Sequence, residues 1–153
     1  METFKIASHM FPVERSEIRR QYSAAWKKAR SGVMPSAQEK SIAEVISEHP
    51  EYQALIESGE AALEAEFPPE AEQTNPYLHL GLHIAIREQA AIDRPPGVRA
   101  IHAALVAARG VHKAEHAMIE CLAETLWEAQ RANRPADDAA YLERLRRLAE
   151  SRT

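Results

Sequence analysis

The chain has 153 residues, a net charge of −4 at pH 7 and a hydrophobic share of 45%. This length predicts one compact domain, and the composition is typical of a folded protein rather than a disordered tail. No stretch offers the roughly 18 apolar residues of a membrane helix, and the first residues lack a signal-peptide pattern. We therefore expect a cytoplasmic protein that does not enter a membrane. The small net charge predicts no binding to nucleic acid.

The composition also predicts the fold class. The chain contains 28 alanines, only 5 glycines and 6% aromatic residues, which favours helices over strands. We predict an all-α, single-domain helical bundle of about five to six helices over residues 12–150, with residues 1–11 as an N-terminal extension. The single cysteine, Cys121, excludes an internal disulfide and any thiolate-rich zinc or iron–sulfur site. A metal ion in this protein would need histidine and carboxylate ligands.

Helix start and stop residues divide the first third of the chain. Pro12 begins a first helix that ends at Gly32. Ser36 and Glu39 form a capping box for a second helix, which ends at Pro50. One face of this second helix carries four residues at helical spacing, Ile42, Val45, Ile46 and His49.

The middle of the chain contains the strongest helix signal. A short continuation of the second helix ends at Gly59, and residues 60–73, which are acidic, are expected to form a weak helix that runs into a loop. Asn75 can accept hydrogen bonds from the free amides of the next helix, and Pro76 has no amide to satisfy. This third helix runs to about Ile92 and is apolar on nearly every side, which indicates a buried central helix.

The last third contains three further helices. The residues 93–97 break the central helix, and a fourth helix then runs from Val98 to Gly110. A long fifth helix covers residues 111–131. Arg134 and Pro135 separate it from a last amphipathic helix, whose apolar side carries Tyr141, Leu142, Leu145 and Leu148.

The charges are unevenly distributed along the chain. Residues 15–40 contain seven basic side chains and two acidic ones, whereas residues 41–86 contain nine glutamates and no lysine or arginine. In one interpretation, basic and acidic helices face each other within the fold or across a homodimer. In the other, the basic first helix docks an acidic partner, and the protein is a metal-free interaction module.

Five of the seven histidines lie between positions 79 and 116. His79 and His83 are four residues apart and so share one face of the central helix. His112, His116 and Glu120 repeat this spacing in the long fifth helix. With a rise of about 1.5 Å per residue, the two histidine pairs reach similar heights if their helices lie side by side. Paired imidazoles on facing helices are the pattern of a metal site in a helical bundle.

Glu115 is a candidate for a further role at this site. The segment from His112 to His116 matches the H-x-x-E-H signature of inverted zinc hydrolases, but the chain is too short for that fold. On the helical wheel, Glu115 falls between Leu122 and Leu126, where an ionised carboxylate needs a partner. We expect it to be a metal ligand, an acceptor for an imidazole, or a catalytic base.

The remaining aromatic residues and histidines have simpler interpretations. We expect His102 to be structural, His9 and His49 to lie at the surface, and Trp26 and Trp127 to belong to the core. A single histidine on an apolar face is more often a hydrogen-bonded core residue than a ligand, and it is the presence of two pairs that favours a metal.

Several segments together resemble a family of small bacterial proteins, the domain-of-unknown-function family 1841. They are Asn75 to Leu80, His83 to Gln89, Asp93 to Gly97, His112 to Leu122, and Trp127 to Arg131. The resemblance extends from about Met10 to Leu148. It implies a bacterial, all-helical, cytoplasmic protein without an assigned activity, and it supplies no known catalytic residues.

We therefore predict a divalent transition metal, Zn, Fe, Mn or Ni, bound by His79, His83, His112, His116 and Glu120. Imidazole and carboxylate ligands suit all four metals. With four or five protein ligands the site is structural, and with three ligands and a water it is hydrolytic or redox-active. The sequence leaves this choice open, and with it the question of whether the protein is an enzyme.

Overall fold

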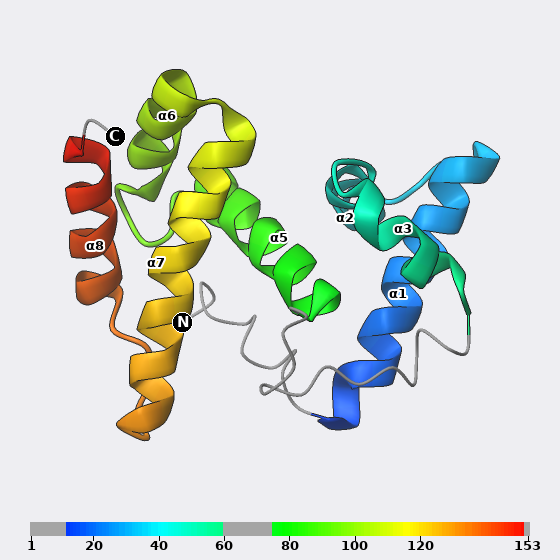
Figure 1. The fold of residues 1–153 in the computed structure, drawn as a ribbon, viewed down its shortest axis with the longest axis horizontal. Coiled ribbons are helices and arrows are strands. Elements are labelled where there is room, and N and C mark those ends of the chain that lie inside the picture. The colour runs from blue at the N-terminus through cyan, green and yellow to red at the C-terminus, as the bar shows by residue number, and fades with distance from the viewer. Residues whose placement is uncertain (1–11, 60–74, 152–153) are drawn as a thin grey trace. The chain divides into compact units, whose positions relative to one another are not determined.

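The computed structural model describes residues 12–59 and 75–151. These residues form seven α-helices and no β-strand (Figure 1). The helices are α1 (Pro12–Ser31), α2 (Ala37–Ser47), α3 (Pro50–Glu57), α5 (Pro76–Ile92), α6 (Val98–Arg109), α7 (Val111–Arg131) and α8 (Asp138–Glu150). The all-α class is confirmed, and the expected five to six helices is slightly too low. The predicted continuation of the second helix is a separate helix, α3, because the chain turns at His49 and restarts at Pro50.

The helices form two compact units, one within residues 6–84 and one within residues 85–153. Helix α5 contributes residues to both units.

In the described ranges, no helix combines the length and the hydrophobicity that crossing a membrane requires. The predicted extension at residues 1–11 and the predicted weak helix at 60–73 lie outside the described residues, and the single domain over 12–150 stays a prediction.

The unit of residues 6–84 has one apolar core. Helix α1 packs against α2 and α3 (Figure 1), and the first turns of α5 join the same core. Its buried members are Tyr22, Ala25, Ile42, Val45, Ile46, Ile56, Tyr77 and Leu80. The first turns of α5 therefore pack in the same core as α1, α2 and α3.

Two predicted caps fix the ends of these helices. The hydroxyl of Ser36 accepts a hydrogen bond from the amide of Glu39 at 3.1 Å, and the Glu39 carboxylate accepts one from the amide of Ser36 at 2.9 Å. The side-chain oxygen of Asn75 accepts hydrogen bonds from the amides of Tyr77, at 3.0 Å, and Leu78, at 3.3 Å. Both caps satisfy amides that would otherwise have no partner at a helix start.

Several of the basic side chains of α1 have partners within their own unit. The Lys28 ammonium lies 2.7 Å from the Glu39 carboxylate, and the Arg30 guanidinium lies 3.2 Å from the Glu57 carboxylate. Arg19 is buried, and its guanidinium carbon lies 4.6 Å from the centre of the Tyr77 ring. Of these contacts, the Arg30–Glu57 pair joins the basic residues 15–40 to the acidic residues 41–86, which supports the interpretation that the two segments face each other within the fold.

The unit of residues 85–153 has a second core. Helices α6, α7 and α8 pack against one another (Figure 1). The Tyr141 hydroxyl donates a buried hydrogen bond of 2.6 Å to Gln89 of α5. The prediction that Trp127 belongs to the core is wrong, because 54% of its surface is exposed. It lies beneath the guanidinium of Arg131, which is 4.7 Å from its ring, and a large amphipathic ring of this kind can remain at a surface.

The Lys28–Glu39 ion pair generates a pH-dependent prediction. The hydrogen bond from Lys28, followed by the one from the Ser36 amide, lowers the pKa of Glu39. A carboxyl with a lowered pKa stabilises the folded state above its unfolded pKa and loses this contribution as the pH falls through the lowered pKa. We expect Lys28→Met to have a lower urea midpoint than the wild type at pH 7. At an acidic pH where Glu39 is protonated, the two proteins should have the same urea midpoint.

The neighbouring variant Lys27→Met is the control, because Lys27 is exposed and a single surface charge contributes little. An equal loss of stability for Lys28→Met at every pH would show that packing of the lysine side chain, and not its charge, is responsible.

Candidate metal centre

Two histidines of α5 meet on one face of the helix. His79 and His83 are separated by one turn, and their ring centres lie 4.8 Å apart with the rings nearly perpendicular. The Nε2 atoms of the two rings are 3.2 Å apart. His83 is 1% exposed, whereas His79 is half-buried. The helix start at Asn75 and the apolar residues between these histidines together fix the direction in which the pair points.

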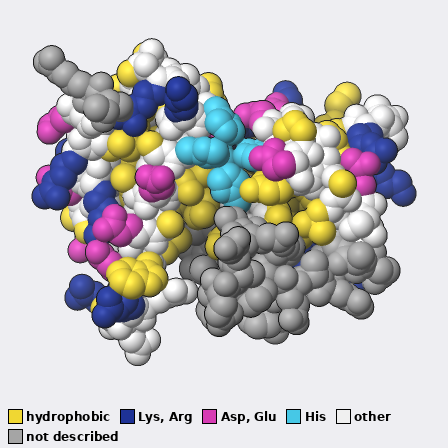
Figure 2. Space-filling view, viewed as in Figure 1, with side chains coloured by type: hydrophobic (Ala, Val, Ile, Leu, Met, Phe, Trp, Pro, Cys, Tyr) yellow, Lys and Arg dark blue, Asp and Glu magenta, His cyan; other side chains and the backbone are white. Residues whose placement is uncertain are grey.

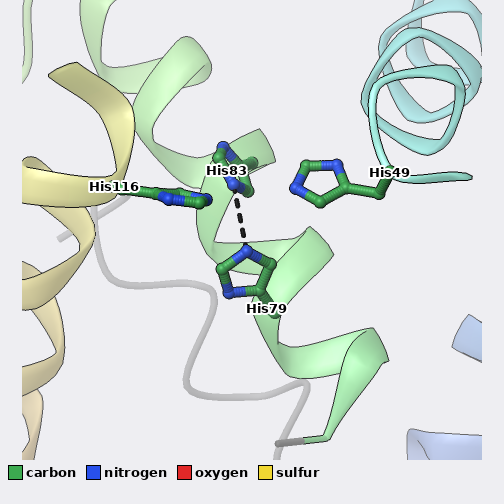
Figure 3. Close-up of side chains that lie close together, drawn as sticks. All are labelled: His49, His79, His83 and His116. Atoms are coloured by element: carbon green, nitrogen blue, oxygen red, sulfur yellow. Dashed lines mark hydrogen bonds between the residues drawn. The ribbon is translucent and has the colours of Figure 1, made fainter. Parts of the chain in front are cut away.

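A third imidazole, from His49, belongs to the same unit. His49 occupies the position between α2 and α3 and is 1% exposed. Its ring centre lies 4.6 Å from that of His83 and 5.2 Å from that of His79. Tyr52 stacks on its other side, with an angle of 4° between the ring planes. Figure 3 shows the rings of His49, His79 and His83 turned toward one another.

A backbone contact determines which nitrogen of His49 is available. Its Nδ1 atom lies 2.8 Å from the carbonyl oxygen of Val45. Because a carbonyl oxygen only accepts hydrogen bonds, Nδ1 carries the hydrogen. In the neutral ring, Nε2 then keeps its lone pair. Histidines that bind metals in proteins are almost always oriented in this way, with the second nitrogen donating to a backbone carbonyl or a carboxylate.

The spacing of the three rings fits the dimensions of a metal site. The candidate ligand atoms lie within 4.8 Å of one another. A tetrahedral ion with metal–nitrogen bonds of 2.0–2.1 Å holds neighbouring nitrogens about 3.3 Å apart, close to the 3.2 Å between His79 and His83. A hydrogen bond between two imidazoles also explains that distance, but it does not account for a third imidazole oriented by Val45. The group could hold a divalent metal ion.

The other predicted ligands come from α7, in the unit of residues 85–153. The rings of His112 and His116 lie 4.1 Å apart, as expected from their spacing. His116 is half-buried, whereas His112 and Glu120 are exposed. Figure 3 also labels His116 on its helix. The predicted ligand set of five residues stays a prediction.

Glu115 is buried, as predicted, and it has a charged partner. Its two carboxylate oxygens accept hydrogen bonds from the Nε and Nη2 atoms of Arg87 at 3.0–3.2 Å. Only 2% of the Glu115 side chain is exposed. His102, which we expected to be structural, has its Nε2 atom 3.6 Å from the same carboxylate, which is too long for a hydrogen bond. This geometry supports a structural role for Glu115, in which its ion pair with Arg87 connects α7 to α5.

The prediction that His49 lies at the surface is wrong. The signal that identifies it was present in the sequence, because His49 shares the apolar face of Ile42, Val45 and Ile46. The following proline suggested a helix end and therefore exposure. Instead, the chain turns there and keeps the His49 ring inside the core, with its Nδ1 bonded to the last turn of α2.

Fold and site together define a helical protein with three clustered imidazoles of the kind that can bind a metal. The chain belongs to the family described as "Domain of unknown function (DUF1841)", which it matches over residues 14–147. No curated protein and no solved structure is similar enough to match it. The predicted resemblance is confirmed over most of the chain.

The Glu115–Arg87 pair generates a prediction that distinguishes a structural role of Glu115 from a role in metal binding. Removing one partner of an ion pair leaves the other charge uncompensated, and the Arg87 side chain is largely buried, with 22% exposed. We expect Glu115→Gln to lower the free energy of unfolding by about 3 kcal/mol and to leave metal binding unchanged. Urea denaturation and metal analysis of the same sample test both points.

Glu143→Gln is the matched control, since Glu143 pairs with Arg147 on an exposed part of α8 and such pairs contribute at most about 1 kcal/mol. Full stability of Glu115→Gln with a loss of metal would instead assign Glu115 to the metal centre, as a ligand or as an acceptor for an imidazole.

Proposed function

We propose that this protein binds one divalent transition-metal ion, Zn, Fe, Mn or Ni, through His49, His79 and His83. The observation that carries the proposal is the meeting of three imidazoles in one unit, two of which, His49 and His83, are 1% exposed. Three neutral imidazoles suit each of these metals. The orientation of His49 by Val45 supports the proposal further, because Nδ1 donates to the Val45 carbonyl oxygen, as the second nitrogen of metal-binding histidines does.

A three-imidazole set leaves at least one coordination position for a further ligand. His116 of the predicted ligand set belongs to the unit of residues 85–153, and we do not include it in the proposed set. His112 and Glu120 are exposed, and we do not include them in the proposed set. The three proposed ligands all lie in the unit of residues 6–84.

The ion would connect two segments of the chain that are separated in sequence. His49 lies at the α2–α3 turn and the other two ligands lie on α5. A ligand that binds only the folded state stabilises it, by about 2.7 kcal/mol when its concentration is 100 times its dissociation constant. Metal binding would therefore stabilise the unit as well as supply any chemistry at the ion.

Metal binding is tested by titrating untagged, metal-free protein with Zn²⁺. We expect the wild type to bind one ion and to melt at a higher temperature with Zn²⁺ than with a chelator. Because His79 is a ligand and is only half-buried, His79→Ala should keep its helical circular dichroism. Its affinity should fall by at least about 10-fold, the smallest loss seen for residues that only support a ligand.

His102→Gln is the matched control, because His102 is a half-buried histidine of α6 that does not belong to the group. We expect it to bind Zn²⁺ like the wild type. A wild type that binds no Zn²⁺ and melts at the same temperature with and without it would contradict the proposed function.

A further inference from the structure

The candidate centre has a charge that its own ligands do not balance. Imidazole binds a metal as a neutral ligand, so an ion held by His49, His79 and His83 keeps its full charge of +2. Among the described residues, the group whose atoms lie close enough to share an ion consists of histidines alone, without a carboxylate.

The surroundings make this charge costly. His49 and His83 are each 1% exposed, and Val45, Ile46 and Leu80 of the adjoining turns belong to the apolar core. An uncompensated charge in such surroundings is strongly unfavourable, and proteins compensate it with an opposite charge in contact. An anion bound directly to the ion would reduce the net charge of the centre to +1.

The geometry also restricts the size of this anion. The half-buried His79 ring gives the centre a side that is accessible to solvent. Figure 2 shows histidine side chains on the face of the molecule that it draws. The burial of His49 and His83, with Tyr52 stacked on His49, leaves little room around the other rings. A group of two or three atoms can approach an ion there more easily than a bulky one.

We infer that the metal-loaded protein binds one small monovalent inorganic anion, of the size of hydroxide or azide, directly on the ion. This inference rests on the proposed function. The anion takes a coordination position that the imidazoles leave open. With Zn²⁺ as the ion, hydroxide in that position would be a nucleophile at neutral pH, because zinc lowers the pKa of its bound water to about 7.

The test uses protein loaded with Co²⁺, whose visible absorption bands depend on its ligands. We expect azide to change these bands in a saturable way, with one azide bound per Co²⁺. Sodium perchlorate has the same charge and coordinates metals poorly, so at equal concentration it should leave the bands unchanged. The His102→Gln variant loaded with Co²⁺ should respond to azide like the wild type.

The outcomes separate the inference from the proposed function. If Co²⁺ binds and azide has no more effect than perchlorate, the anion site does not exist and the metal site remains. If benzoate binds as tightly as azide, the centre is open to large anions and the size restriction is wrong. If the protein takes up no Co²⁺ at all, both the proposed function and this inference are contradicted.

Discussion

The close approach of the Nε2 atoms of His79 and His83 is the contact that the rest of the candidate centre depends on. In a helix, two imidazoles four residues apart are neighbours. Their Nε2 atoms lie 3.2 Å apart, a distance that suits either a hydrogen bond between the two rings or one ion bound by both. The Asn75 cap and the apolar core of the unit hold this pair in place. His49 turns the pair into a group of three, because Val45 fixes its hydrogen on the nitrogen that points away.

The buried polar groups of the two units are satisfied by different means. In the unit of residues 85–153, the buried carboxylate of Glu115 is matched by the guanidinium of Arg87, so its charge is compensated within the protein. In the unit of residues 6–84, the rings of three histidines come together, and imidazoles can serve as ligands of a cation. This difference explains why we assign the chemistry to the histidines and a structural role to Glu115, although the sequence pattern around Glu115 resembles a hydrolase signature.

The sequence predicted much of the fold because the helix ends carry local signals. The capping box at Ser36 and the cap at Asn75 act over three or four residues, and both are confirmed. The pairing of His79 with His83 is equally local. The apolar face of the second helix could have predicted the burial of His49. Its contact with His79 and His83 could not be predicted, because these residues are 30 or more positions away in the chain and no local pattern encodes such a contact. The exposure of Trp127 was missed for a similar reason, since helical spacing alone does not say which positions find a partner.

The central claim is that imidazoles of this chain form the first coordination shell of a metal ion. X-ray absorption spectroscopy of the Zn²⁺-loaded, untagged protein tests it most directly, because it measures the identity and distance of the atoms bound to the ion. The account predicts three or four nitrogens at about 2.0–2.1 Å, with the outer-shell scattering of imidazole rings. A shell of oxygens without ring scattering, or a sulfur neighbour at about 2.3 Å, would contradict it.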